Sequence, residues 1–454
     1  MAKNATIVRL KGTGTWTVPA GVTQINIYSE FNGVSSIAAG PNFSVIRNQS
    51  GAAYMFGANT YGQLGDSTLV NKSSPVPVVG GYSFVQVATG GGHCIGIESD
   101  GRAYAWGLNR TNDLFPIGTG QLGDNSILDK SSPVLVVGGH SFIQVAAGTR
   151  HSLALKADGS VYAWGQNTNS QLGNNDPTSA SKSSPVPVSG SHAFIQVAAG
   201  GNHSLALKAD GSVYTWGYNS NGQLGDNSIV SKSTPVPVSG SHAFIQVAGG
   251  LNYSLALKAD GSVYAWGLNT NGQLGDNSIT AKSSPVPVSG SHAFIQVAGG
   301  TYHSLALKAD GSVYAWGSNI NGQLGDNSTA DKSSPVLVSG SHSFIQVAAS
   351  KNFNPGLESM FYHSMAVKSN GQVYTWGGNI YGELGDNTVV VKSSPVLISG
   401  TYFISDLSGS SLRYSRNVTP GESISYKASG LSPNYFGDIP IASDMTEIII
   451  KYFS

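Results

Sequence analysis

Residues 294–327 read FIQVAGGTYHSLALKADGSVYAWGSNINGQLGDN, and closely similar copies of this stretch recur along the 454-residue chain. The tryptophan of the copy, Trp316, returns at spacings of fifty residues as Trp266 and Trp216. The equivalent positions of the other copies, separated by small insertions, are held by Phe56, Trp106, Trp164 and Trp376. Seven repeats of one unit predict a repeat architecture, in which each unit packs mainly on its neighbours.

Four short segments of each copy have the pattern of β-strands. In the quoted copy they are residues 294–298, 303–309, 312–317 and, further on, 334–338, all rich in β-branched or aromatic residues. The Asp310-Gly311 pair between the second and third segments is typical of a tight hairpin turn. Four-stranded antiparallel units arranged around an axis make a β-propeller. The predicted fold class is therefore all-β, a seven-bladed β-propeller, with an open solenoid as the alternative.

The composition argues against several classes of protein. Only 11% of the residues are charged and the formal net charge is zero, which disfavours a nucleic-acid-binding surface and a polybasic membrane patch. We see no apolar run of about 18 residues and no secretory signal in the opening MAKNATIVRLKG, so we expect no membrane insertion and synthesis in a cytoplasm. Cys94, the single cysteine, is expected to be a small buried residue.

The repeat motif L-x-x-D-G-x-V-Y-x-W-G-x-N-x-x-G-Q-L-G, found within Leu305 to Gly325, resembles the regulator-of-chromosome-condensation repeat family. The resemblance covers roughly Val34 to Gly400 and implies a seven-bladed propeller. It does not imply one function, since the family includes a guanine-nucleotide exchange factor, a β-lactamase inhibitor and many scaffolds. The exchange-factor activity is disfavoured, because this chain lacks the charged contacts and the basic tail that such a protein would usually need.

The two ends of the chain, residues 1–32 and 401–454, are predicted to form one small β-sandwich into which the propeller, residues 33–400, is inserted. The phrase WTVPAGVT near the start, with VTPGESI and IIIKY near the end, resembles a small β-domain of bacteriophage tail and fibre proteins. This resemblance implies a virion protein located in the phage tail.

No catalytic constellation stands out, and we expect neither an enzyme nor a cofactor. The histidines form two series, one just before the first strand of a copy and one at the start of the second strand. Equivalent histidines of different copies are separated around the ring, so they would not meet at one metal ion. We therefore expect them to be buried or turn residues rather than metal ligands. The aspartates of the GQLGD segments are expected to cap turns rather than bind calcium. The histidines are His140, His192, His242, His292 and His342, and His93, His151, His203, His303 and His363.

Sequence variation among the copies is concentrated in the loops after the first and third strands, which lie on one face of a propeller. Both large insertions, at residues 108–119 and 350–362, also belong to these loops, and they could flank a single patch. Aromatic residues and arginine commonly anchor interfaces. Alternatively, the loops vary because nothing constrains them, or their aromatic residues pack against each other. The candidate partner-binding residues are Arg110, Phe115, Tyr218, Phe353, Phe361 and Tyr362.

The leading interpretation is a non-enzymatic phage tail fibre or adhesin. Its partners would be other virion proteins, and a host-surface glycan or receptor contacted through the propeller loops. It could also form a homo-oligomer, although no coiled-coil heptad supports this. The alternative is a free protein-binding propeller that acts as an inhibitor or a scaffold. An enzyme that uses the propeller as a platform is the third class.

Overall fold

The computed structural model describes residues 5–17, 24–29, 34–110, 118–351, 361–399, 414–417, 423–428, 434–436, 439–441 and 447–453. The chain divides into two compact units, one of residues 34–369 and 373–399 and the other of residues 1–33, 370–372 and 400–454. Among the described residues, no helix has the length and apolar character that a membrane span requires.

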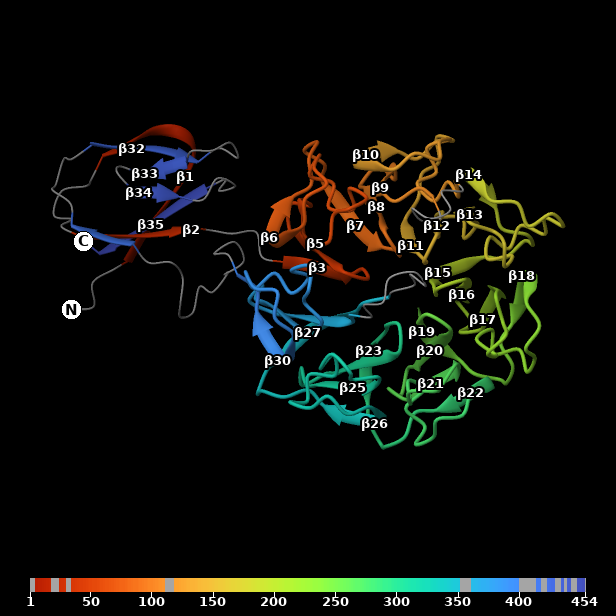
Figure 1. Cartoon of the computed structure of the whole chain (residues 1–454). Coiled ribbons are helices and arrows are strands. Elements are labelled where there is room, and N and C mark those ends of the chain that lie inside the picture. Colours follow the sequence, from red (N-terminus) through yellow and green to blue (C-terminus); the bar gives the residue numbers. More distant parts are fainter. Residues whose placement is uncertain are drawn as a thin grey trace. The chain divides into compact units, whose positions relative to one another are not determined.

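The larger unit consists of seven four-stranded antiparallel sheets, the blades of a propeller, each built from one contiguous segment (Figure 1). The four strands of a blade are called A to D in chain order. Blade 1 contains β3 (Val34–Ala39), β4 (Phe43–Asn48), β5 (Ala53–Gly57) and β6 (Lys72–Pro77). Blade 2 contains β7 (Phe84–Thr89), β8 (His93–Glu98), β9 (Ala103–Gly107) and β10 (Lys130–Leu135). Blade 3 contains β11 (Gln144–Ala147), β12 (His151–Leu155), β13 (Val161–Gly165) and β14 (Lys182–Pro187).

Blades 4 to 7 repeat this order with the same strand lengths in most positions. Blade 4 contains β15 (Phe194–Ala199), β16 (His203–Lys208), β17 (Val213–Gly217) and β18 (Lys232–Pro237). Blade 5 contains β19 (Phe244–Gly249), β20 (Tyr253–Lys258), β21 (Val263–Gly267) and β22 (Lys282–Pro287). Blade 6 contains β23 (Phe294–Gly299), β24 (His303–Lys308), β25 (Val313–Gly317) and β26 (Lys332–Leu337). Blade 7 contains β27 (Phe344–Ala349), β28 (His363–Lys368), β29 (Val373–Gly377) and β30 (Lys392–Leu397).

Strands A, B and C of the quoted copy lie within one residue of their predicted ends, and strand D differs more. Strand β26 begins at Lys332, two residues before the expected start, because Lys332 pairs with Gly317 on the far side of a register shift. Gly311 has a φ of 82°, as the predicted hairpin turn requires. A strands surround the central channel and D strands lie outermost (Figure 1).

The hydrophobic core lies between consecutive blades, at interfaces that we call junctions. At the junction of blades 5 and 6, Trp316 has no exposed surface and packs among Leu255, Leu257 and Phe294. Burial of a ring of this size is a large hydrophobic contribution to stability. The repeated tryptophan therefore fills the space between neighbouring blades.

A repeated set of buried hydrogen bonds accompanies the tryptophan at most junctions. Trp316 Nε1 and Ser304 Oγ of blade 6 both donate to the carbonyl of Gln273 in blade 5, at 2.9 and 2.8 Å. On the other side of blade 6, His303 Nε2 lies 3.0 Å from Ser364 Oγ of blade 7. These bonds satisfy polar groups that burial would otherwise leave unpaired.

A second set of bonds connects the A strands around the channel. The side chain of Gln296 in blade 6 accepts from Val347 N at 3.0 Å and donates to Val347 O at 3.3 Å. Each such glutamine therefore covers the free edge of the next A strand, which would otherwise present unpaired backbone groups. The equivalent glutamines are Gln86, Gln144, Gln196, Gln246 and Gln346.

Blades 7 and 1 meet through the histidine–serine and glutamine contacts found between most other blades, so the ring is closed and the open solenoid is wrong. His363 Nε2 lies 2.8 Å from Ser44 Oγ, and this hydroxyl donates to the carbonyl of Glu383 at 2.9 Å. Gln346 Oε1 accepts from Ile37 N at 3.3 Å. Non-covalent contacts between two complete blades are therefore sufficient to close the ring.

The junction of blades 1 and 2 departs from the repeated pattern. Phe43 stands in place of the histidine, and Cys94 replaces the serine that would bond to it. Both side chains are buried in the same cluster, which confirms the expectation for Cys94. An apolar pair therefore fills this junction where most other junctions contain a histidine–serine bond.

Glu383 occupies the position that a glutamine holds in the other copies. We therefore expect the effect of replacing it by glutamine on the free energy of unfolding to depend on pH. Burial raises the pKa of the Glu383 carboxyl from 4.5 to about 7. A folded-state pKa above the unfolded one gives stability that is complete below about pH 4.5 and is lost as the pH rises through 7. We expect Glu383→Gln to stabilise the protein by about 1–3 kcal/mol at pH 8 and to change little at pH 5. Denaturant unfolding at both pH values measures the difference.

The matched control is Gln323→Glu, which places a carboxyl at the equivalent buried position of blade 6. It should destabilise the protein at pH 8 more than at pH 5. Equal effects of Glu383→Gln on stability at the two pH values would contradict the raised pKa of the Glu383 carboxyl.

The smaller unit joins the two ends of the chain in one antiparallel hydrogen-bonded set, in the order β31-β2-β35-β1-β32-β33-β34. Strand β1 pairs first with β35 and then, from Gly12 onward, with β32. The two ends therefore combine as expected, whereas the packing of two layers into a sandwich stays a prediction. The strands are β1 (Ala5–Thr17), β2 (Gln24–Ser29), β31 (Tyr414–Asn417), β32 (Ser423–Ala428), β33 (Asn434–Phe436), β34 (Ile439–Ile441) and β35 (Glu447–Phe453).

Candidate partner-binding site

The A–B and C–D loops lie on one face of the propeller, which we call the variable face. The first residue after strand C donates to the carbonyl of the A–B turn in each blade, as in Ser318 N to Tyr302 O at 2.7 Å. The B–C and D–A loops meet on the opposite face, as in Phe344 N to Gly311 O at 2.9 Å. Residues flanking both long insertions belong to loops of the variable face.

The described candidate residues are spread over three blades rather than gathered in one patch. Arg110 lies in blade 2, where its Nε is 2.9 Å from Asp129 Oδ2. Tyr218 is half-buried in blade 4, while Phe361 and Tyr362 precede strand B of blade 7. The other two candidates, Phe115 and Phe353, lie outside the described residues.

The expected exposure of Tyr362 is wrong, because only 2% of this residue is exposed. Its ring packs edge-on against Tyr302, with 5.7 Å between ring centroids and 87° between planes. Its backbone N–H donates to Asn321 Oδ1 at 3.2 Å. Tyr362 therefore supports the surface residues rather than presenting its own ring to a partner.

A groove of about 720 Å³ lies on the variable face across blades 5, 6 and 7. This volume is within the range of binding pockets. Phe361 and Tyr362 are the two sequence-predicted residues that contribute to it. The lining consists of Leu268, Thr270, Asn271, Tyr302, Ser318, Ile320, Asn321, Thr329, Asp331, Phe361 and Tyr362.

Hydrogen bonds hold the polar side of the groove in place. Asp331 Oδ1 accepts from the backbone N–H of Asn319 at 2.7 Å, and Oδ2 accepts from Asn271 Nδ2 at 3.1 Å. Burial raises the pKa of the Tyr302 hydroxyl, so this ring is uncharged at neutral pH. One carboxylate therefore stands among aromatic and aliphatic walls.

Sequence reasoning missed Tyr302, Ile320 and Asp331 as groove residues. Tyr302 and Ile320 do occupy loop positions that vary among the copies, and this was the available signal. The groove itself could not be predicted, because it arises only where loops of three consecutive blades meet.

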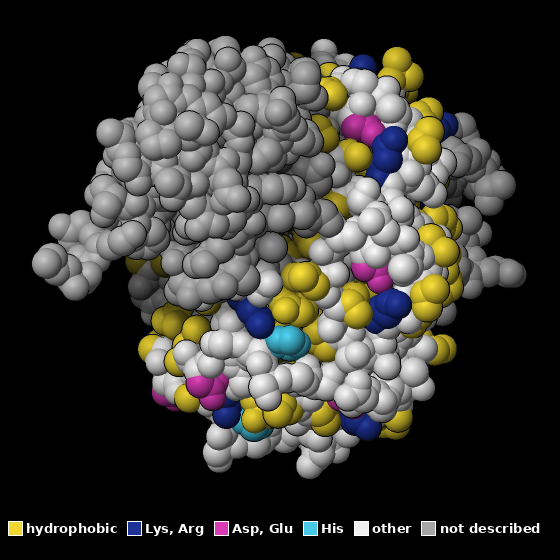
Figure 2. Space-filling model, turned by 90° about the vertical axis from the view of Figure 1, so that its left-hand side faces the viewer, with side chains coloured by type: hydrophobic (Ala, Val, Ile, Leu, Met, Phe, Trp, Pro, Cys, Tyr) yellow, Lys and Arg dark blue, Asp and Glu magenta, His cyan; other side chains and the backbone are white. Residues whose placement is uncertain are grey.

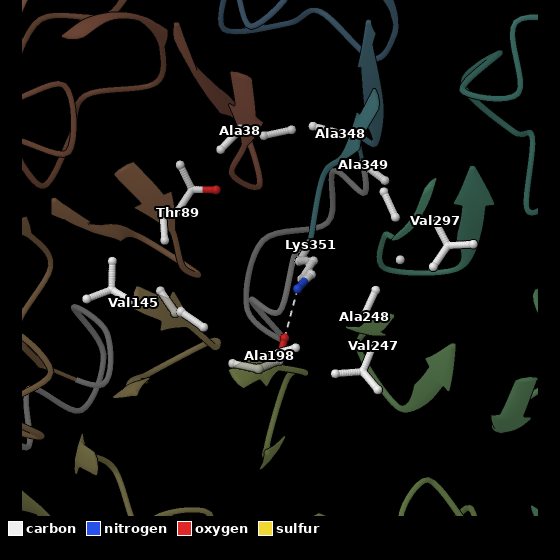
Figure 3. A pocket seen from close by; sticks show the side chains of 18 of the residues that line it. Ala38, Thr89, Val145, Ala198, Val247, Ala248, Val297, Ala348, Ala349 and Lys351 are labelled. Atoms are coloured by element: carbon white, nitrogen blue, oxygen red, sulfur yellow. Dashed lines mark hydrogen bonds between the residues drawn. The ribbon is translucent and has the colours of Figure 1, made fainter. Parts of the chain in front are cut away.

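The central channel is a second hollow, of about 270 Å³, lined mainly by A-strand residues (Figure 3). Lys351 projects into it and donates to the carbonyl of Ala199, on a distant blade, at 2.8 Å. Desolvation lowers the pKa of Lys351 from 10.5 to about 8. The glutamines of the A strands around the channel already bond to neighbouring A strands.

The two histidine series have structural roles. Histidines of the D–A loops stack near aromatic rings, as His292 does 4.5 Å from Tyr314 between ring centroids. Histidines that begin strand B are fully buried and make the junction bonds described above. No group of three or more metal-ligating side chains occurs in the described part of the chain.

The aspartates of the GQLGD segments cap turns, as the sequence predicts. Asp326 Oδ1 accepts from Ser328 N at 3.1 Å and from Asn319 Nδ2 at 3.0 Å, and Lys332 lies 3.8 Å from its other oxygen. Acidic and basic side chains lie next to one another among hydrophobic ones on the described part of the surface in Figure 2. The surface shown there therefore has no extended patch of one charge.

A closed ring of repeat blades with varied loops on one face defines a class of repeat propellers that carry variable loops on a rigid frame. The chain belongs to the RCC1-like domain family, whose pattern matches residues 113–412. Regulator of chromosome condensation (RCC1) repeats also match residues 50–97, and residues 34–63 and 84–112. The resemblance seen in the repeat motif is therefore confirmed.

Individual relatives are similar over part of their length. The ultraviolet-B receptor UVR8 of Arabidopsis thaliana is 31% identical over 199 residues, 43% of this chain and 44% of that protein. The mitochondrial RCC1 domain-containing protein RUG3 of the same plant is 29% identical, over 46% of this chain and 47% of that one. The chain thus spans less than half the length of these relatives.

Solved structures confirm the fold. Human WBSCR16 is 25% identical with a TM-score of 0.62, over 70% of this chain and 84% of that one. Prp20p of Saccharomyces cerevisiae, described with its binding to Gsp1p and histones, is 23% identical with a TM-score of 0.66, over 83% and 88% of the two chains.

The expected location in a phage virion tail is wrong. The relatives are RCC1-type proteins of eukaryotes, among them the mitochondrial RUG3 and Protein pim1 of Schizosaccharomyces pombe. The resemblance of the terminal segments to a phage fibre domain is carried by none of these matches. Partners in a virion or on a bacterial surface consequently have no support.

Proposed function

We propose that this chain is a non-enzymatic, protein-binding propeller whose variable face contacts a partner protein. The groove across blades 5 to 7 is the observation that supports this most strongly, because it combines aromatic walls with a fixed carboxylate. Aromatic side chains in a pocket are typical of the residues that dominate protein interfaces. The function is thus the alternative drawn from the sequence, an inhibitor or a scaffold.

Exposed apolar side chains around the groove support a protein partner. Ile320 at the groove is 69% exposed, and the tips of the neighbouring C–D loops carry Ile279 at 67% and Val389 at 59%. Several apolar side chains exposed on one face are more typical of an interaction surface than isolated ones. Arg110, Phe115, Tyr218, Phe353 and Phe361 remain the proposed contacts, with Tyr362 supporting them from below.

The terminal unit is proposed to be a two-layer β-sandwich with boundaries at residues 1–32 and 401–454. Strand β1 supports this, because it exchanges one partner strand for another at Gly12 and so can belong to two sheets. A domain closed in this way would fix both ends of the propeller chain.

Substitution of variable-face residues tests the function. We expect Arg110→Ala, Phe115→Ala and Phe361→Ala together to weaken binding at least about tenfold, because interface anchors carry most of the binding energy. A displayed library of random peptides is panned against the full chain, and each enriched peptide is titrated against the wild type and the triple variant.

The control is a second triple variant, Ile195→Ala, Ile245→Ala and Ile295→Ala, at exposed positions of the A strands. Binding that survives the first triple variant and is lost in the second would contradict the proposal. Thermal unfolding of both variants verifies that the ring is intact.

A further inference from the structure

Blades 2 and 6 carry an aspartate at the same repeat position, Asp129 and Asp331, directly before strand D. In both blades the Oδ1 atom accepts from a backbone N–H at 2.7 Å, that of Asn109 or Asn319. The two blades therefore hold an aspartate at the same repeat position through the same backbone hydrogen bond.

In blade 2 the chain itself supplies a cation to this carboxylate. Arg110, the residue after Asn109, places its Nε 2.9 Å from Asp129 Oδ2, and the Asp129 side chain is only 19% exposed. In blade 6 the equivalent residue is Ile320, which has no charge to offer. No described lysine or arginine lies within ion-pair distance of Asp331, which is exposed in the groove.

The remaining contacts of Asp331 leave room for a further donor. Its Oδ2 accepts a single hydrogen bond, from Asn271 Nδ2 at 3.1 Å. A carboxylate oxygen has two lone pairs and can accept a second bond from a charged donor.

The walls of the groove suit a guanidinium better than an ammonium group. Tyr302 and Phe361 provide aromatic surface, and Leu268 and Ile320 provide aliphatic surface for methylene groups. A guanidinium is planar and weakly hydrated, and it stacks on aromatic rings, whereas an ammonium group holds its water strongly.

We infer that the groove receives an arginine side chain of the partner protein, which pairs with Asp331 as Arg110 pairs with Asp129. This inference rests on the proposed function and adds the chemistry of the contact. Two observations lead to an arginine as the occupant. Its charge is opposite to that of Asp331, and blade 2 already contains an arginine–aspartate pair, Arg110 with Asp129.

The peptides enriched by panning against the full chain test the inference. They should contain arginine, and Asp331→Asn should weaken their binding about tenfold or more, since charge-assisted bonds are the strong ones. Ile320→Arg should weaken it similarly, because the new side chain would pair with Asp331 in cis. Replacing the peptide's arginine by lysine should also reduce affinity.

Asp310→Asn is the control for net charge, because it removes a carboxylate of the same blade on the opposite face and should leave binding unchanged within about twofold. Enrichment of peptides without arginine, or binding unchanged in Asp331→Asn and Ile320→Arg, would overturn the inference. If such peptides still lose affinity in the variable-face triple variant, only the arginine contact fails. If no peptide responds to any variable-face substitution, both proposals fail.

Discussion

Replacing Trp316 by alanine is expected to lower the free energy of unfolding by about 3–5 kcal/mol, the range for large aromatic residues of a core. The ring is fully buried at the junction of blades 5 and 6, among Leu255, Leu257 and Phe294. Alanine would leave a cavity there and remove the bond from Nε1 to the carbonyl of Gln273. Equilibrium unfolding in guanidinium chloride, followed by far-UV circular dichroism, measures the loss.

Trp316→Phe is the matched control, because blade 1 already holds Phe56 at the equivalent position. Phenylalanine retains most of the apolar contact and loses the hydrogen bond, so its cost should be about 1–2 kcal/mol. An alanine variant no less stable than the phenylalanine variant would show that the junction does not depend on this ring. Because repeat proteins are coupled through neighbouring units, both variants should weaken blades 5 and 6 first.

The blades themselves were predictable because their residues follow short-range rules. Strand positions, the Asp310-Gly311 turn and the capping role of Asp326 all depend on contacts within one copy, and every copy repeats them. The direction of the loops also follows from four antiparallel strands. The fold was therefore recoverable from periodicity and turn residues.

The junction contacts were not predictable in the same way. The histidine of one copy bonds to the serine of the next, 51 or more residues away, as His203 bonds to Ser254. A signal for this pairing did exist, since Phe43 and Cys94 replace the histidine and its serine together in consecutive copies. The glutamine found in strand A of six of the seven copies likewise did not indicate that its side chain bonds to the neighbouring A strand.

The candidate site was predicted only as a face. The variable loops indicated the side of the propeller on which the groove lies and two of its lining residues, Phe361 and Tyr362. They could not show that Tyr362 is buried beneath Tyr302, because this depends on how loops of adjacent blades pack. The phage assignment failed because it rested on short phrases in the terminal strands, which carry β-pattern and turn residues common to many β-domains.

Lowering the pH is expected to unfold the propeller through the histidines that begin strand B. Burial lowers the pKa of each from 6.5 to about 3. A folded-state pKa below the unfolded one gives stability that is complete above about pH 6.5 and is lost as the pH falls toward 3. The five residues are His93, His151, His203, His303 and His363.

The buried environment explains why these rings stay neutral. The single proton of Ser364 Oγ is donated to the carbonyl of Gln323 at 2.8 Å, so the hydroxyl must accept from His303 Nε2. The other ring nitrogen, Nδ1, is buried without a hydrogen-bond partner among the described residues. A second proton on the ring would therefore add an unpaired charge to the junction.

The size of the effect follows from the number of histidines. At pH 5 each would cost about 2 kcal/mol, at about 1.36 kcal/mol per pH unit, and five together about 10 kcal/mol. This is comparable with the whole stability of a typical domain. We expect an acid-unfolding midpoint at about pH 4–5, measured by tryptophan fluorescence during titration.

The double variant His303→Phe with Ser364→Cys reproduces the apolar pair Phe43 and Cys94 at another junction. The ring of His303 lies against Gly300 as that of Phe43 lies against Gly40, so phenylalanine fits the same space. Removing one of the five histidines should lower the pH midpoint of acid unfolding by about 0.3 pH unit. This shift is taken after correcting for any difference between variant and wild type in the free energy of unfolding at pH 7.5. His292→Phe, in the partly exposed series, should shift it much less. Equal midpoints for the double variant and the wild type would show that protonation of the junction histidines does not drive acid unfolding.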